Sequence, residues 1–322
     1  DRVDTVIDAH GDGRRRVTFH ARRRDGEIVM GFMRAKTHDV IDVPFCPLLV
    51  PALRECAALL KLLVRFLVKA DKAIDVAVTA TPAGLDVDLR GYGSVSPSLR
   101  MTLTQEAERL DLARLSVHGD VIVERRTPRM MIGTTDVILP PGSFLQATDA
   151  GQKALQSIVS AHCQEAGHIA DLFSGLGTFA LPLGAHAPVH AVETDAAALH
   201  ALQRALKHAS GLKPITTEAR DLFRRPLVPS ELSAFDHVVL DPPRAGAEAQ
   251  ARMLAQSKVS RVIYVSCHIG SFSRDAALLV AGGYQLRTVK VVDQFRYSTH
   301  CEVVGIFERD EGQNKPKRRL LG

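Results

Sequence analysis

From about residue 150 the sequence alternates short apolar segments with helix-like segments, and this pattern constrains the fold more than any other feature. The apolar segments, which we expect to be strands, are 168–170, 189–192, 237–240 and 262–265. Helical patterns such as 195–208 and 273–281 separate them. Strands that alternate with helices form a parallel, doubly wound sheet, so the second half is predicted to be α/β and Rossmann-like. Two further strand candidates, 286–292 and 302–307, follow.

The first part of the chain has a different pattern. Residues 1 to about 125 alternate short strand candidates (17–21, 27–32, 75–78 and 85–89) around one helix, which we expect in the apolar stretch 53–68. The sequence therefore predicts a smaller α+β domain at 1–140, an α/β domain at 141–309 and a basic, disordered tail at 310–322.

Length and composition place the chain among globular proteins. With 322 residues, 46% of them hydrophobic, it is long enough for two domains with sizeable cores. No apolar run approaches the roughly 20 residues that a membrane helix needs, and the polar start lacks a signal peptide, so we expect a cytoplasmic protein without a membrane partner. Five cysteines without a CxxC pair predict reduced thiols.

Basic residues cluster near the start of the chain. The formal net charge is +5, and Arg14, Arg15 and Arg16 are followed by three more arginines at 22–24. Clustered cations bind nucleic acids by displacing counterions from phosphates. A solvated charged face is the alternative for such runs. We expect the 1–140 region to add RNA affinity through these arginines.

A glycine-containing turn follows the first strand of the α/β half. The segment 171–179 carries Gly175 and Gly177, which let a ligand approach the backbone next to a helix N-terminus. Alone, this turn fits a dinucleotide fold, a methyltransferase or a plain tight turn. Glu193 ends the next strand, where a carboxylate can bind ribose hydroxyls, and Asp221 follows the third, where it can bind an adenine edge. With Asp241 after the fourth strand, the pattern favours a methyltransferase.

A cysteine and a glutamate complete the candidate site. Cys267 ends the fifth strand, beside the Asp241 turn, where a thiolate can attack an electron-poor ring carbon. Glu302 begins the last strand and can act as a general base. A buried structural thiol and a solvated carboxylate are the alternatives for these two residues taken singly.

These residues resemble those of a known family, the RNA uracil-C5 methyltransferases. The resemblance covers about 142–309 and is carried by Phe144-Leu145-Gln146, Asp171-Leu172-Phe173-Ser174-Gly175-Leu176-Gly177, Asp241-Pro242-Pro243-Arg244-Ala245-Gly246, Val265-Ser266-Cys267 and His300-Cys301-Glu302. It implies Cys267 as nucleophile and Glu302 as base. It also implies that S-adenosylmethionine contacts Gln146, Phe173, Thr178, Glu193, Asp221 and Asp241. Where the family has Ser-Cys-Asn-Pro, this chain has Ser266-Cys267-His268-Ile269, so the resemblance does not carry over the loop geometry after the nucleophile.

A weaker resemblance continues upstream, where 11–16 and 45–51 look like the central RNA-binding domain of the ribosomal-RNA branch. There the cysteine matched by Cys46 is one of four iron–sulfur ligands, and the other three are absent here. One thiolate cannot hold a four-iron cluster, so Cys46 is a ligand only if a longer chain supplies the others. Since the chain does not begin with Met, we expect either a trimmed protein or one that works without the cluster and the family's N-terminal barrel.

The resemblance implies an RNA partner, with rRNA favoured over tRNA, and we expect a monomer. It also implies a mechanism in which Cys267 adds to C6 of uracil, C5 accepts the methyl group and Glu302 removes the C5 proton. Amino-group methyltransferases share the Pro-Pro turn but follow it with an aromatic residue, where this chain has Arg244. A non-catalytic RNA-binding module is the remaining alternative, against which the retained Cys267 and Glu302 argue.

Overall fold

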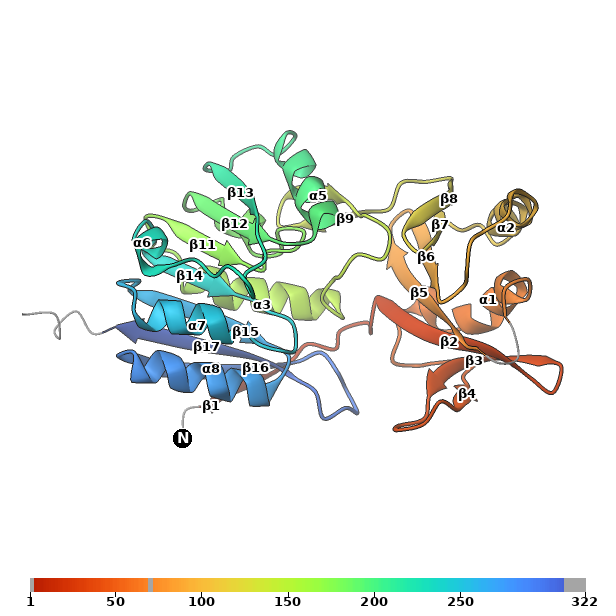
Figure 1. The fold of residues 1–322 in the computed structure, drawn as a ribbon, viewed down its shortest axis with the longest axis horizontal. Helices are drawn as coiled ribbons and strands as arrows, with labels where there is room; N and C mark the ends of the chain where they lie inside the picture. Colours follow the sequence, from red (N-terminus) through yellow and green to blue (C-terminus); the bar gives the residue numbers. More distant parts are fainter. Residues whose placement is uncertain (1–2, 69–71, 310–322) are drawn as a thin grey trace, which may run out of the picture. The chain divides into compact units, whose positions relative to one another are not determined.

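The computed structural model describes residues 3–68 and 72–309, which divide into two compact units (Figure 1). Unit 1 contains 3–8, 153–199 and 209–309, and unit 2 contains 9–152 with 200–208. The first domain had been expected to end at residue 140, whereas unit 2 runs to Gln152 and the first strand of the chain belongs to unit 1. The expected basic tail, 310–322, lies outside the described residues.

Unit 1 is built on an eight-stranded sheet in the order β1-β16-β17-β15-β14-β11-β12-β13. The strands are β1 (Val3–Asp8), β11 (Ile169–Leu172), β12 (Val189–Glu193), β13 (Ile215–Ala219), β14 (His237–Leu240), β15 (Arg261–Ser266), β16 (Tyr284–Asp293) and β17 (Glu302–Arg309). The five strands from β11 to β15 pair in parallel, and β11, β14 and β15 are almost fully buried. This α/β, Rossmann-like sheet confirms the predicted fold class.

Two features of this sheet were not predicted. β17 runs antiparallel to both β15 and β16, because the eight-residue connection between β16 and β17 is too short for the crossover that parallel strands need. The sheet is therefore mixed rather than purely parallel. In addition, β1, from the start of the chain, pairs in parallel with β16, with Val6 opposite Val291.

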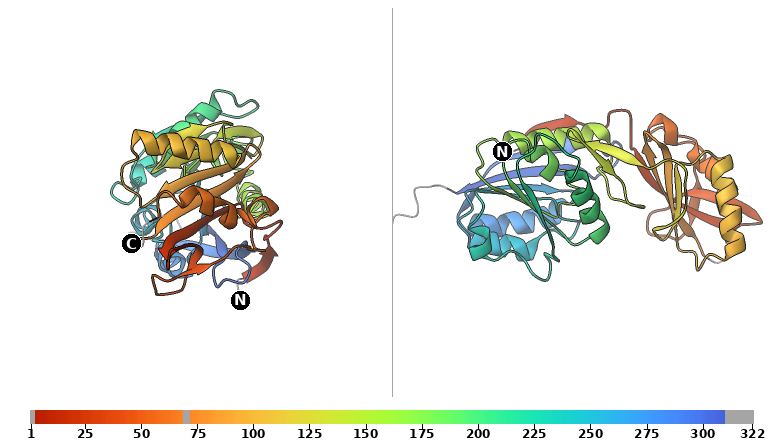
Figure 2. Two further views of the ribbon diagram at one scale, coloured as in Figure 1. Left: turned by 90° about the vertical axis from the view of Figure 1, so that its right-hand side faces the viewer. Right: turned by 90° about the horizontal axis from the view of Figure 1, so that it is seen from above.

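Helices cover both faces of the unit 1 sheet. In two views, α7 (Glu248–Ala255) and α8 (Ile269–Ala281) lie along one face and α3 (Asp149–Ala161) along the other (Figures 1 and 2). Of the remaining helices, α4 (Ala180–Leu183) and α6 (Pro229–Leu232) belong to unit 1, whereas α5 (Ala196–Leu206) is divided between the two units after Leu199. Because each parallel strand is followed by a return segment, the carboxyl ends of β11 to β15 meet at one edge of the sheet.

Unit 2 is a seven-stranded sheet in the order β4-β3-β2-β5-β6-β7-β8, with two helices. The elements are β2 (Arg16–Arg24), β3 (Glu27–Met33), β4 (Val40–Asp42), the 3-10 turn Pro51–Leu53, α1 (Cys56–Val64), β5 (Ile74–Thr81), β6 (Gly84–Arg90), α2 (Pro97–Arg109), β7 (Arg114–Val117) and β8 (Asp120–Glu124). A separate hairpin joins β9 (Arg129–Ile132) to β10 (Thr135–Ile138).

The prediction of a single helix in unit 2 was wrong. The apolar stretch 53–68 gives only the nine-residue α1, and α2 is a second helix with few buried residues. Its start was readable, since Ser96 Oγ accepts a hydrogen bond from the Leu99 amide at 3.2 Å and Pro97 follows at the first helical position.

Candidate active site

The turn after β11 is strained and open on one side. Phe173 adopts φ 65°, a left-handed conformation that costs a non-glycine residue on the order of 1–3 kcal/mol. Its ring lies 5.5 Å from the ring of Phe223, which follows β13. Gly175 has φ 55°, and a Cβ built there would meet no atom within 4 Å. The backbone is therefore accessible at Gly175, as a cofactor turn requires.

Glu193, at the end of β12, holds this turn. Its Oε2 accepts a hydrogen bond from the Gly175 amide at 2.8 Å, and Oε1 accepts from the amides of Thr194 and Asp195 at 2.7 and 2.8 Å. The carboxylate is half-buried and each oxygen can accept further bonds. Glu193 thus lies where it can both fix the turn and meet ribose hydroxyls.

Two polar side chains beside the turn lack partners. Asp171 is fully buried in β11 and Ser174 is 3% exposed. Within residues 3–68 and 72–309, neither carboxylate oxygen of Asp171 nor the Ser174 hydroxyl has a hydrogen-bond partner. Burial raises the pKa of Asp171 to about 7. The Ala180 amide, which lies outside hydrogen-bond geometry, opposes this rise, whereas the charge of Glu193 adds to it. Buried polar groups of this kind fit a ligand that brings its own donors and positive charge.

The other residues expected in the cofactor site occupy different places. Asp221 follows β13, and its Oδ1 accepts from the amide of Phe223 at 2.9 Å. Thr178 precedes α4, and its carbonyl accepts from Gln156 Nε2 at 2.9 Å. Gln146 lies in unit 2, where its carbonyl accepts from Arg15 Nε at 3.0 Å. Unit 1 therefore gathers the expected residues at one edge of its sheet apart from Gln146, whose cofactor role stays a prediction.

Cys267 lies where β15 ends, next to three charged groups from two other segments, the turn after β14 and the start of β17. Burial raises the pKa of its thiol, as do the nearby carboxylates of Glu302 and Asp241, while Arg244 lowers it. The pKa of Asp241 is raised well above its ordinary value by burial, then by Glu302 and Asp171. Since these electrostatic effects require proximity, the structure brings Cys267, Asp241 and Glu302 together.

The segment after Cys267 forms an ordinary helix start. His268 is the N-cap of α8, and its Nδ1 accepts a hydrogen bond from the Ser271 amide at 3.1 Å. Ile269 takes the first helical position, where proline is favoured but not required. At the two positions where the family has Asn-Pro, His268 therefore caps α8 and Ile269 begins it.

Glu302, the first residue of β17, is 4% exposed. Its Oε1 accepts a hydrogen bond from Gln294 Nε2 at 3.2 Å. Burial raises the pKa of Glu302 to about 7, against the opposing effect of Gln294. A carboxylate with this pKa is suited to accept and release a proton near neutral pH. Sequence reasoning missed Gln294, Asp171 and Ser174; the last two lie in the glycine-turn motif, whereas no sequence signal marks Gln294.

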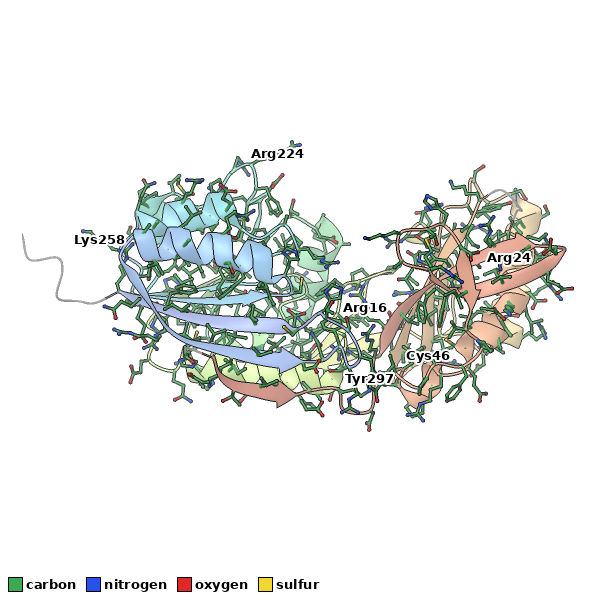
Figure 3. The ribbon with its side chains drawn as sticks, turned by 90° about the horizontal axis from the view of Figure 1, so that it is seen from below. Arg16, Arg24, Cys46, Arg224, Lys258 and Tyr297 are labelled. Carbon is green, nitrogen blue, oxygen red and sulfur yellow. The ribbon has the colours of Figure 1, made fainter. Side chains whose placement is uncertain are left out.

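The arginines at the start of unit 2 are not a solvated face. Arg15 is 6% exposed and donates to Gln152 Oε1 at 2.7 Å, and Arg16 donates to the Leu145 carbonyl at 3.0 Å and lies over the Phe144 ring (Figure 3 labels Arg16). Burial lowers the pKa of Arg15 to about 10. The burial of Arg15 argues against the expected contact with RNA phosphates, because its guanidinium is used inside unit 2.

Cys46 is buried in unit 2 (Figure 3). Burial lowers the pKa of the neighbouring Arg14 and raises the pKa of the Cys56 thiol to about 12, and Cys46 has a smaller, raising effect on both. In the described part of the chain, no group of three or more histidine, cysteine or acidic residues could hold a metal. The residues present thus do not form an iron–sulfur site, and Cys46 as a ligand stays a prediction for a longer chain.

Comparison with known proteins decides the family. The model of the tRNA (uracil-5-)-methyltransferase family matches residues 137–310. An RNA methyltransferase of Brucella suis is 43% identical over 314 residues, which are 95% of this chain and 74% of the relative. The chain belongs to this family. As a uracil-C5 methyltransferase family member, it is an S-adenosylmethionine-dependent RNA methyltransferase.

Two further matches bear on the family's branches. The 23S rRNA (uracil(1939)-C5)-methyltransferase of Pectobacterium carotovorum is 26% identical over 94% of this chain and 69% of that protein. The Pyrococcus abyssi tRNA (uracil-54, C5)-methyltransferase, solved with S-adenosyl-L-homocysteine, has a TM-score of 0.73 at 22% identity and covers 94% of this chain and 78% of that one, so it shares the fold. In residues 3–68 and 72–309 no helix has the length and apolarity of a membrane span.

Proposed function

We propose that this uracil-C5 methyltransferase family member modifies a uridine of 23S rRNA, with Cys267 as nucleophile and Glu302 as base. The observation that supports this most is the proximity of the Cys267 thiol to the Glu302 and Asp241 carboxylates, which is expressed in their pKa values. C5 of uracil is a weak nucleophile. A thiolate on C6 makes C5 enolate-like, and a base must later remove the C5 proton.

The chain's own residues then act in two stages. The Cys267 sulfur forms a bond to C6, and the electron pair of the C5–C6 double bond moves toward C5 and the C4 carbonyl. After C5 has been methylated, Glu302 takes the C5 proton. The electrons of that C–H bond restore the double bond while the C6–S bond breaks and returns Cys267 as a thiolate. Because the target ring must reach Cys267, the uridine leaves its stack.

The cofactor fits the edge of the sheet in unit 1. We assign it to the Phe173–Gly175 turn, with Glu193, Asp221 and Asp241 as polar contacts and the partnerless Asp171 carboxylate near its positive charge. When bound, S-adenosylmethionine supplies an electrophilic methyl group to C5. Glu193 and the open side of Gly175 orient and admit the ligand, and burial of Asp171 excludes water from this part of the site.

The choice of 23S rRNA rests on a relative. The Pectobacterium protein, whose name specifies 23S rRNA, matches nearly the whole chain. A tRNA substrate is the competing outcome, and transcripts of both kinds separate the two.

Substitution of the two proposed catalytic residues tests the mechanism. Cys267→Ala should abolish both methyl transfer and adduct formation, because nothing activates C5. Glu302→Gln should transfer the methyl group but stall before elimination, so that methylated RNA stays bound to the protein in denaturing gels. The measurement uses 23S rRNA and tRNA transcripts with radiolabelled methyl groups.

Cys301→Ala is the matched control, since Cys301 adjoins Glu302 and is also partly exposed. It should turn over without a trapped adduct. Normal turnover by Glu302→Gln would remove Glu302 as the base. Methyl transfer by the wild type with no adduct band from either Cys267→Ala or Glu302→Gln would point to an amino-group methyltransferase. If the wild type binds RNA but transfers no methyl group, the protein is a non-catalytic RNA-binding module.

A further inference from the structure

Glu302 occupies an environment that is unfavourable for a negative charge. It is almost fully buried. The charged forms of Cys267, Asp241 and Cys301 interact with it, and each of these groups would be negative. Arg244 faces Cys267 and Asp293 faces Cys301. An ionised Glu302 therefore depends on hydrogen-bond donors in its immediate surroundings.

Gln294 is such a donor. Its side chain is fully buried, and Nε2 lies 3.2 Å from Glu302 Oε1. Gln294 directly follows β16, whose Val292 pairs with Glu302 in the antiparallel ladder. The bond thus spans the base of the loop between β16 and β17, the loop that carries the exposed Tyr297 (Figure 3). The backbone pairing fixes the distance across which Gln294 reaches.

We infer that Gln294 is a positioning residue for the proposed base, holding the Glu302 carboxylate in place and in its ionised form for removal of the C5 proton. The inference rests on the proposed function of Glu302. The Gln294 carboxamide also suits the protonated form of Glu302, because after rotation its Oε1 accepts a hydrogen bond from the carboxylic acid. Gln294 can therefore satisfy Glu302 before and after proton transfer.

The test separates elimination from addition. An adduct is formed in a single turnover, and its breakdown is followed against pH in denaturing gels. In the wild type, breakdown should accelerate as pH rises through about 7, because Glu302 must be ionised. In Gln294→Met, similar in length but without a donor, breakdown at pH 7 should be about tenfold slower or more, and the midpoint should move to higher pH.

Three readouts keep the result specific. Adduct formation should change little in Gln294→Met, which shows that the Cys267 region is intact. Gln294→Asn, which retains the donor on a shorter side chain, should recover part of the breakdown rate. Gln285→Met is the matched control, since Gln285 is an exposed residue of β16, the strand that Gln294 follows. It should behave as wild type.

An unchanged midpoint in Gln294→Met would overturn the inference. If that variant also fails to form adducts, the nearly isosteric Gln294→Glu replaces it. Two carboxyl groups at that distance share one proton and titrate as a coupled pair, so the single midpoint must be replaced by two steps, and an unchanged single midpoint again overturns the inference. If adduct breakdown stalls in Glu302→Gln while its pH midpoint is unchanged in Gln294→Met, only the role of Gln294 is refuted. Normal adduct breakdown in Glu302→Gln refutes Glu302 as the base.

Discussion

Three acidic side chains, Asp171, Asp241 and Glu302, lie close together in unit 1, and burial raises the pKa of each. Such groups cost folding free energy when they ionise without a positive partner. S-adenosylmethionine carries a sulfonium and an ammonium group, so this cluster of carboxylates is matched to a cationic ligand. Under the proposed function, the burial that makes these carboxylates costly to ionise is also what would favour the cationic cofactor beside them.

Asp171→Asn should make the free protein less sensitive to rising pH. The pKa of Asp171 is about 7 in the fold against 3.8 for an ordinary aspartate, so the folded state binds more protons between these values and stability falls as pH rises through them. The full effect is about 4 kcal/mol, and Asn lacks it. Urea denaturation at pH 4.5 and pH 8 measures the difference. Equal pH dependence of the two proteins would contradict it.

Helix α8 connects the proposed nucleophile, Cys267, to the turn after β14. Its first turn is capped by His268, next to Cys267, and Ser271 Oγ donates to the Arg244 carbonyl at 3.0 Å. Deeper in the helix, the fully buried Asp275 accepts from the Ala247 amide at 2.7 Å and from the Tyr264 hydroxyl at 2.6 Å. One helix therefore sets the relative positions of the two segments that carry Cys267 and Asp241.

Asp275→Ala should destabilise the protein by about 3 kcal/mol, since it leaves the buried Tyr264 hydroxyl without its acceptor and the Ala247 amide with only the Tyr264 oxygen. It should also slow adduct formation, because the Arg244–Ala247 segment loses its buried contact with α8 and keeps only the bonds nearer the surface. Glu248→Ala is the control: Glu248 forms exposed ion pairs with Arg252 and Arg274, and such pairs contribute less than about 1 kcal/mol. Comparable losses in the two variants would contradict the role given to Asp275.

The elements differed in how far the sequence could predict them. Glu193, Asp241 and Cys267 follow buried parallel strands, and their shared edge results from the topology, so their grouping was predictable from periodicity alone. The partner of β1 was not predictable, because six residues of strand pattern carry no mark of a partner near the other end of the chain. The burial of Gln294 depends on the β16–β17 pairing and was equally hidden. The catalytic roles themselves remain predictions.

At the scale of the whole molecule, the chain forms unit 1 from segments that lie on both sides of unit 2 in the sequence. Unit 2 has its own core and its own buried polar contacts. Arg15 is one of these, joined to Gln146 and Gln152 from the far end of the unit. Arg15 thus connects the first strand of unit 2 to the segment that leads into α3.

Arg15→Met should lower the stability of unit 2 by about 3 kcal/mol, because a buried, charge-assisted hydrogen-bond set is lost. At a temperature where the variant is folded, the dependence of RNA affinity on salt should equal that of the wild type, since a buried guanidinium releases no counterion. Urea denaturation and filter binding at several salt concentrations give both quantities. A slope reduced by about one unit would restore Arg15 as a phosphate contact.

The pairing of β1 with β16 has a consequence for protein synthesis. Residues 3–8 are translated before unit 2, whereas 284–293 emerge only after unit 2 and most of unit 1 have been translated. At roughly 5–20 residues per second, the first strand waits many seconds for its neighbour while the intervening unit can already fold. During that wait its backbone groups are open to incorrect partners. A nascent chain that stalls before β16 therefore carries a folded unit 2 and an unpaired β1.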